Sequence, residues 1–243
     1  MNELNPLLII PAYNEEESLS SVILELREFQ PELDFIIVND GSSDNTVEVA
    51  VSMNANILDL PVNLGLSGAF EAGVKYAKQK GYDCVIQFDA DGQHMASSIP
   101  SMILEAQKGA DIVIGSRFLK TKKNRSLRMM GSDLIALAIR LTTGVNLTDP
   151  TSGLRLYNKS AIDAYLSVPN MTPEPDTMSF YIKSNAQIKE VQVNMRERLA
   201  GDSYLTVSRS IRYMLRMTIS ILILQFFRKK LDLTKMNRMA VGK

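Results

Sequence analysis

The sequence has few of the features that mark secreted or membrane-spanning proteins. Its 243 residues include one cysteine, Cys84, so a disulfide within the chain is impossible and a reducing compartment is expected. Cys84 lies in an apolar run, which favours a packing role over a nucleophilic one. Residues 1–5 contain no basic region before an apolar one, which argues against a secretory signal. We therefore expect a cytoplasmic protein.

The apolar segment at residues 217–227 is too short to cross a membrane. It has eleven residues without charge, whereas a spanning helix needs about 20. Basic residues bracket it, with Arg216 before it and residues 228–230 after it. This pattern suits a helix that lies in the interface of an anionic membrane or docks on a small membrane protein. The alternative is an amphipathic helix that closes the core or a homo-oligomer.

The two common fingerprints of nucleotide-binding proteins are absent. There is no G-x-x-x-x-G-K-[ST] loop and no G-x-G-x-x-G turn, which argues against an ordinary NTPase or dehydrogenase. Net charge is also absent, since 27 basic residues balance 27 acidic ones. Eleven basic and three acidic residues follow position 195, a net +8 that leaves −8 on the rest. A basic end on an acidic body indicates an anionic partner. Because aromatic side chains that could stack on bases are few there, nucleic acid is not expected.

What the sequence does have is an alternation of strands and helices. Continuous apolar runs predict five strands, at residues 7–10, 35–38, 57–58, 84–88 and 111–115. Helical periodicity follows each of the first four, and further helices are expected at residues 132–143 and 208–230. This order predicts an α/β fold with a mostly parallel sheet covered by helices on both faces. We divide the chain into a catalytic domain, residues 1–207, and a basic amphipathic helix and tail, residues 208–243.

Polar clusters stand where the predicted strands end. Ligands of parallel sheets bind beyond the carboxyl ends of the strands, so these side chains should converge on one edge. Loop glycines there, such as Gly41 or Gly65, indicate by themselves only turns. The convergent residues are Tyr13, Asn14, Asp40, Asp44, Asn63, Asp89 and Asp91.

The sharpest of these clusters follows the fourth strand. Asp89, Asp91 and Gln93 leave an extended chain on the same side. Three oxygen donors on one edge suit Mg²⁺ or Mn²⁺. The alternative for these residues is an Asp-Gly turn with solvated acids.

Two later segments carry candidates for binding phosphate and for catalysis. A basic stretch from Arg117 to Arg128 is either a solvated loop or a diphosphate clamp, and Arg117 directly follows a strand. Asp149 precedes a proline and a glycine turn, so it is either a turn acid or a carboxylate beside the reacting centre. Residues 173–176 suit the first turn of a helix. Residues 195–206 are expected to form a loop.

Five segments together resemble the family 2 glycosyltransferases with the Rossmann-like GT-A fold. They are Pro11-Ala12-Tyr13-Asn14-Glu15, residues 39–44, residues 89–94, Gly115-Ser116-Arg117 and residues 149–155. Within this family the sequence resembles dolichyl-phosphate mannose synthases and bacterial polyprenyl-phosphate glycosyltransferases. It covers roughly residues 7–203.

The resemblance implies a role for each matching residue. Asp89, Asp91 and Gln93 would hold the metal. Asp149, Asp91 and Arg117 would be the catalytic residues, with Asp149 near the acceptor as a candidate base. Arg155, Arg198 and Ser203 would contact the acceptor or the loop over the site. The nucleotide-sugar donor would contact Pro11, Ala12, Tyr13, Asn14, Glu15, Asp40, Asp44, Asn63, Gly65, Asp89, Ala90, Arg117 and Arg128.

The implied reaction is inverting transfer of a sugar from a nucleoside diphosphate to an acceptor. A polyprenyl phosphate acceptor is already anionic, so Asp149 would mainly orient it, whereas a glycan hydroxyl in cell-wall or surface polysaccharide synthesis would need Asp149 as base. Relatives suggest uridine diphosphate glucose or N-acetylglucosamine, or guanosine diphosphate mannose, as donors. Several relatives carry a transmembrane domain that this chain does not show, so attachment to the inner face of the membrane is expected to be peripheral. A nucleotidyltransferase is the rival enzyme class.

Overall fold

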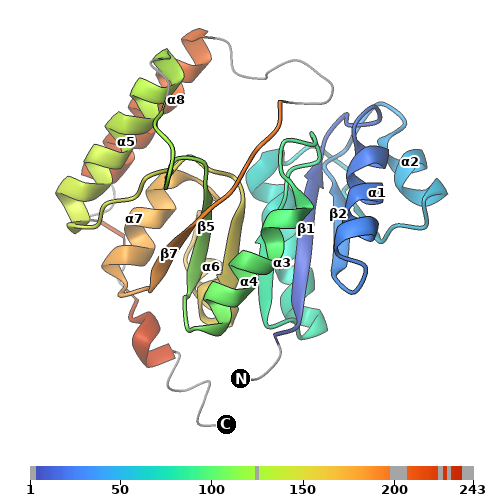
Figure 1. Ribbon diagram of the computed structural model, residues 1–243, viewed down its shortest axis with the longest axis horizontal. Helices are drawn as coiled ribbons and strands as arrows, with labels where there is room; N and C mark the ends of the chain where they lie inside the picture. The colour runs from blue at the N-terminus through green and yellow to red at the C-terminus, as the bar shows by residue number, and fades with distance from the viewer. Residues whose placement is uncertain (1–3, 124–125, 198–206, 224–226, 229–230, 237–243) are drawn as a thin grey trace.

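The computed structural model describes residues 4–123, 126–197, 207–223, 227–228 and 231–236, with only the backbone described at 127, 128 and 207–209. These residues form one sheet between two layers of helices (Figure 1). The α/β fold predicted from the sequence is confirmed. The predicted loop positions Arg198 and Ser203 lie outside the described residues.

The sheet has seven strands in the order β3-β2-β1-β4-β6-β5-β7. Six of them are parallel, and β6 runs antiparallel between β4 and β5. The first five strands follow the apolar runs, whereas β6 and β7 were not predicted. The strands are β1 (Pro6–Ala12), β2 (Asp34–Asn39), β3 (Ile57–Asp59), β4 (Cys84–Gln87), β5 (Ile112–Ser116), β6 (Arg155–Asn158) and β7 (Ile188–Gln192).

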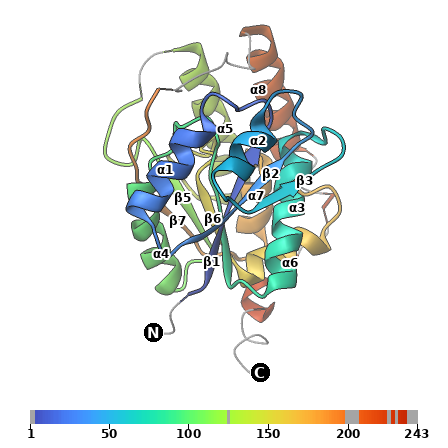
Figure 2. The same cartoon turned by 90° about the vertical axis from the view of Figure 1, so that its right-hand side faces the viewer.

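Helices cover both faces of the sheet (Figure 2). Alternate strand residues point to opposite faces, so Leu7 and Ile9 pack toward one layer while Leu8 and Ile10 pack toward the other. All four are fully or almost fully buried. The first layer contains α3 (Gly65–Lys80), α5 (Leu127–Thr143), α6 (Lys159–Ser167), α7 (Pro175–Lys183) and α8 (Val207–Leu222), and the second contains α1 (Leu19–Phe29), α2 (Thr46–Ser52) and α4 (Ile99–Gln107).

Cys84 is a packing residue of the second layer. Its side chain is fully buried, and burial raises the pKa of its thiol to about 12. A thiol in that state is a poor nucleophile at neutral pH because the thiolate is the reactive form.

Helix α5 begins earlier than its apolar periodicity suggested. The Ser126 hydroxyl accepts a hydrogen bond from the Met129 backbone N–H, which caps the helix start. At the other end Gly144 adopts a left-handed conformation that terminates the helix. Helix α7 begins at Pro175, within the segment expected to start a helix.

Helix α8 lies along α5 and is tied to α7 (Figure 1). The Tyr213 hydroxyl of α8 donates to Glu174, and the Ser220 hydroxyl donates to Asp176 at 2.7 Å. Arg228, which follows the helix, donates to the same Asp176 at 3.2 Å. Among the helices of the described residues, none is both long and apolar enough to be a candidate membrane span. The division of the chain at residue 207 stays a prediction.

Candidate active site

The site lies at the edge of the sheet where the parallel strands end. Strands β1, β2, β4 and β5 all point their carboxyl ends to this edge. Because β6 is antiparallel, it begins there, which brings the preceding loop, residues 149–153, to the same edge. This loop lies close to the end of β4, since a Cβ built on Gly153 would lie 3.1 Å from the Asp89 carboxylate.

A cavity of about 240 Å³ opens at this edge. Eight of the residues predicted to bind the nucleotide sugar or metal share its wall, so Asp91 does lie beside Asp40 and Tyr13. Leu66 and Ala69, from the start of α3, were missed because apolar residues in a helix read as core. The lining is Pro11, Ala12, Tyr13, Glu15, Asp40, Leu66, Ala69, Asp89, Ala90 and Asp91.

Asp40 also joins two loops of the cavity. Its side chain is 3% exposed, and its Oδ1 accepts a hydrogen bond from the Leu64 backbone N–H at 2.7 Å. The next residue, Gly41, has a φ of +67°, and a Cβ there would meet the Asn63 backbone nitrogen at 2.8 Å. Only glycine fits without strain where the backbone at Gly41 approaches the backbone of Asn63 this closely.

Four predicted nucleotide-binding residues support loops and are not among the residues that line the cavity. Asn14 accepts from the Ser43 backbone N–H at 2.8 Å, and Asn63 accepts from the Gly65 N–H at 3.1 Å. Asp44 accepts from the Thr46 hydroxyl at 2.5 Å. Partial burial would raise the pKa of Asp44, but hydrogen bonds from the Thr46 hydroxyl and from three backbone N–H groups outweigh it and hold that pKa below its ordinary value.

The acids after β4 are held by their own turn. The Gln93 backbone N–H donates to Asp91 at 3.0 Å, and the Asp89 N–H donates to His94 Nδ1 at 2.9 Å. Asp91 is 6% exposed and His94 is 2% exposed. His94, whose Nε2 lies 3.5 Å from the Asp89 carboxylate, was not predicted.

The donor set at this turn fits a hard divalent cation in part. Asp89 and Asp91 offer carboxylate oxygens to one cavity, but among the described residues no group of three or more His, Cys, Asp or Glu side chains could hold a metal. Mg²⁺ typically takes one or two carboxylates and fills its shell with water and substrate phosphates. A cation here would therefore depend on substrate oxygens.

Arg117 and Asp149, predicted separately, form an ion pair. Arg117 Nε donates to Asp149 Oδ2 at 2.7 Å, Nη2 donates to Oδ1 at 2.8 Å, and the Arg117 backbone N–H donates to Oδ2 at 3.1 Å. The Asp149 side chain is fully buried, whereas that of Arg117 is 25% exposed. Both residues lie at the predicted edge of the sheet. Each neutralises the charge of the other in this ion pair.

Arg155 lies in a place that does not match its predicted role at the acceptor. It is 1% exposed within β6, and its guanidinium donates to the backbone carbonyls of Pro150 at 2.8 Å and Pro173 at 3.1 Å. These bonds brace the loop that carries Asp149. The side chain of Arg128 lies outside the described residues.

A second cavity, of about 440 Å³, lies between the loop after β5 and helix α5. It combines cations with apolar side chains, and it borders both members of the ion pair through their neighbours Phe118 and Thr148. The lining is Phe118, Thr121, Lys122, Lys123, Asp133, Ala136, Leu137, Arg140, Asn146, Leu147 and Thr148.

Comparison with known proteins decides the family. Residues 7–166, more than half of the chain, match glycosyl transferase family 2. The chain is a family 2 glycosyltransferase. This membership separates it from the nucleotidyltransferases.

Its similar relatives transfer sugars to lipid phosphates, as their names state. The glycosyltransferase is 34% identical over 209 residues to the undecaprenyl-phosphate mannosyltransferase of Micrococcus luteus, covering 81% of this chain and 86% of that one. It is 32% identical over 176 residues to a UDP-N-acetylglucosamine–dolichyl-phosphate N-acetylglucosaminyltransferase of Methanococcus voltae, covering 64% and 70%. It spans 62% of the undecaprenyl-phosphate 4-deoxy-4-formamido-L-arabinose transferase of Pseudomonas fluorescens, at 31% identity over 85% of its own length.

Solved structures share the fold of this glycosyltransferase. The glucosyl-3-phosphoglycerate synthase of Mycobacterium tuberculosis, in complex with phosphoglyceric acid, superposes with a TM-score of 0.70 over 91% of this chain and 80% of that one, at 18% identity. A structure of the same synthase with Mn²⁺, uridine diphosphate and phosphoglyceric acid gives 0.67 at 17% identity, over 91% and 78%. At these identities the likeness shows the GT-A fold alone.

Proposed function

We propose that this glycosyltransferase moves a sugar from a nucleoside diphosphate sugar to a polyprenyl phosphate at the inner face of the cell membrane. In the reaction an acceptor phosphate oxygen attacks the anomeric carbon, the bond from that carbon to the diphosphate breaks, and the nucleoside diphosphate leaves. Uridine diphosphate sugars and guanosine diphosphate mannose are the donors to test first.

The donor would bind in the smaller cavity. Its wall brings Asp40 and Tyr13 within one pocket with Asp89 and Asp91, a set that suits a base and ribose on one side and a diphosphate with a cation on the other. Asp89 and Asp91 would hold Mg²⁺ or Mn²⁺, with Gln93 next to them. Such an ion would offset the negative charge that develops on the leaving diphosphate. The structural neighbour that contains Mn²⁺ and uridine diphosphate supports this assignment by analogy of fold.

The burial and hydrogen bonding of Asp149 are the observations that favour one class of acceptor over the other. Both of its oxygens accept hydrogen bonds from Arg117 and none of its surface is exposed, so this carboxylate is poorly placed to take a proton. A hydroxyl acceptor needs a base, whereas a phosphate monoester is already ionised at neutral pH. The arrangement therefore favours a phosphate acceptor.

The larger cavity has the chemistry of that acceptor. Lys122, Lys123 and Arg140 supply positive charge, and Phe118 and Leu137 supply apolar surface. A polyprenyl phosphate combines an anionic head with an apolar chain, so both parts would find complementary groups. The names of the relatives, which include undecaprenyl and dolichyl phosphate, support the same substrate class.

A donor and acceptor screen tests the proposal. Purified protein would be incubated with Mg²⁺, a radiolabelled nucleotide sugar and a polyprenyl phosphate, and label would be measured in the lipid extract. We expect label in the extract with one donor and the matching nucleoside diphosphate in the aqueous phase. Label that transfers only to a glycan hydroxyl, or no transfer with any of the donors, would contradict the proposal.

A further inference from the structure

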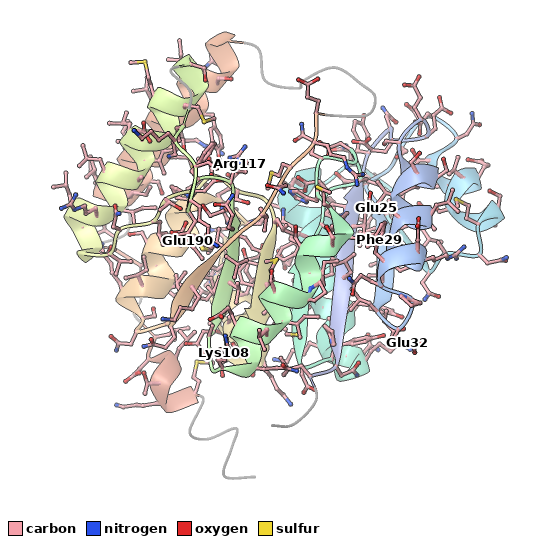
Figure 3. All side chains as sticks on the ribbon, viewed as in Figure 1. Glu25, Phe29, Glu32, Lys108, Arg117 and Glu190 are labelled. Atoms are coloured by element: carbon pink, nitrogen blue, oxygen red, sulfur yellow. The ribbon has the colours of Figure 1, made fainter. Side chains whose placement is uncertain are left out.

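Side chains of strand β7 form hydrogen bonds with the backbone of Arg117 and Asp149. This strand lies outside the five family motifs found in the sequence. Strand β7 is at the edge of the sheet and pairs with β5, with Glu190 opposite Ile114 and Gln192 opposite Ser116. Figure 3 labels Arg117 and Glu190, which come from the segment after β5 and from β7.

Glu190 holds the backbone of the residues that carry the buried carboxylate. Its carboxylate accepts hydrogen bonds from the Thr148 N–H at 2.9 Å, the Thr148 hydroxyl at 3.0 Å and the Asp149 N–H at 2.9 Å. Hydrogen bonds to an ionised acceptor are stronger than neutral ones. They fix the direction in which the Asp149 side chain leaves the backbone.

The same strand also holds the other side of the pair. Gln192 donates from its amide to the Arg117 carbonyl at 3.0 Å and accepts from the Lys120 N–H at 2.7 Å. The Thr148 hydroxyl, already bonded to Glu190, lies 2.6 Å from the Ser116 hydroxyl. Hydrogen bonds from side chains of β7 therefore hold the backbone of both Asp149 and Arg117.

We propose that Glu190 is a positioning residue for catalysis, which acts through Asp149 and Arg117 without touching substrate. Gln192 supports it from the arginine side. The inference rests on the proposed function for its kinetic test only, because the hydrogen bonds are independent of which sugar or acceptor is used.

Hydrogen exchange tests the positioning without any assay of activity. In Glu190→Ala the three bonds are lost, so amides of residues 146–152 should exchange at least about tenfold faster than in the wild type. Amides of β2, on the far side of the sheet, should be unchanged. Lys189→Ala is the matched control, since Lys189 is the exposed neighbour on the same strand. Unchanged exchange at residues 146–152 would overturn the inference, whatever the enzyme transfers.

A double-mutant cycle tests whether this positioning matters for catalysis. Glu190→Ala should lower kcat by up to about tenfold, no more than the loss expected for Asp149→Asn, because a reacting geometry is displaced by an ångström or less. The KM for the donor should stay within about twofold, because Glu190 is not in the wall of the donor cavity. Glu190→Gln keeps one oxygen acceptor and should recover part of kcat.

The decisive comparison is the effect of Glu190→Ala in an Asp149→Asn background. If Glu190 acts through Asp149, the second substitution should cost less than about threefold there. Losses that multiply independently, with a thermal midpoint lowered in proportion, would show a merely structural role and overturn the inference. If exchange responds as expected but the wild type labels no polyprenyl phosphate, the proposed function fails and the positioning role stands.

Discussion

Arg117 and Asp149, 32 positions apart in the chain, meet in a two-pronged ion pair with N···O distances of 2.7 and 2.8 Å. Planar arginine suits this geometry, which adds direction as well as energy. The loop that carries Asp149 reaches the smaller cavity, where Gly153 lies close to Asp89, and the neighbours of the pair, Phe118 and Thr148, line the larger cavity. A group that faces both substrates would be placed here.

Removing one charge of this pair should destabilise the protein. Asp149→Asn leaves the Arg117 guanidinium without its buried partner, which should lower the free energy of unfolding by roughly 3 kcal/mol. Asp163→Asn is the control, because Asp163 forms a solvent-exposed ion pair with Lys78 and such pairs contribute about 1 kcal/mol or less. Urea titration measures both. Equal losses in the two variants would contradict the role of the buried pair.

Asp149→Asn should also separate the two acceptor classes. With a polyprenyl phosphate we expect kcat to fall about tenfold, since the carboxylate orients and does not take a proton. A hydroxyl acceptor would lose roughly 10² to 10⁴-fold, the usual contribution of general base catalysis. Steady-state rates with the identified acceptor measure this. A loss greater than about a thousandfold with a phosphate acceptor would point to a base after all.

The close approach of the backbone at Gly41 to that at Asn63 should leave no room for a side chain at Gly41. Gly41→Ala forces a Cβ to 2.8 Å from the Asn63 backbone nitrogen at a φ of +67°, so the cost should exceed the strain of a left-handed alanine, which is about 1 kcal/mol. Gly81→Ala is the control, because Gly81 has a φ of +83° with nothing within 4 Å of its Cβ position. Chemical denaturation should rank Gly41→Ala as the less stable variant. The reverse order would show that the loop can move away.

Asp44 should stabilise the protein at neutral pH and less in acid. Its pKa in the folded protein is lowered below the ordinary value of 3.8, so the stabilisation is fully present above that value and is lost as the pH falls through the folded pKa. Asp44→Asn should therefore be less stable than the wild type at pH 7, with a smaller difference below pH 3.8. Denaturation at several pH values measures the difference. A gap that widens in acid would contradict this assignment.

The part of the site that the sequence predicted is the part built from consecutive residues. Asp89 and Asp91 directly follow an apolar strand, and parallel strands carry such residues to one edge, so their meeting with Asp40 could be expected. The pairing of Arg117 with Asp149 could not, because it depends on β6. That strand begins with a charged residue and has four residues, which gives no clear apolar run.

Glu190 was hidden for a related reason. Its strand reads Ile188-Lys189-Glu190-Val191-Gln192, a pattern in which charged and polar residues look like a solvated edge. The carboxylate faces backbone N–H groups that lie 41 and 42 positions away in the chain. No local pattern records such a contact. For Arg155 the sequence suggested too much. Its motif suggested a contact with the acceptor or the loop over the site, whereas its side chain is buried and donates to backbone carbonyl groups.

The exposed apolar stripe of α8 should bind anionic membranes. Ile211, Leu215 and Ile219 are each more than half exposed, with Arg212 and Arg216 beside them. Leu215→Glu should weaken sedimentation with phosphatidylglycerol vesicles about tenfold, the effect of losing one buried leucine side chain. Leu24→Glu is the control, as Leu24 is 59% exposed on α1 in the other helical layer. Equal binding by both variants would favour a protein partner or a second copy of the chain at α8.

The most direct test of the account is the metal dependence of sugar transfer in the wild type and in Asp91→Ala. Label transferred into the lipid extract would be measured while Mg²⁺ or Mn²⁺ is titrated into metal-free protein. We predict no transfer without the ion, saturation as it is added, and a rate at least about 100-fold lower in Asp91→Ala at any concentration of metal. Transfer that persists in excess chelator, or an Asp91→Ala variant as active as the wild type, would contradict the proposal that these carboxylates hold a cation against the leaving diphosphate.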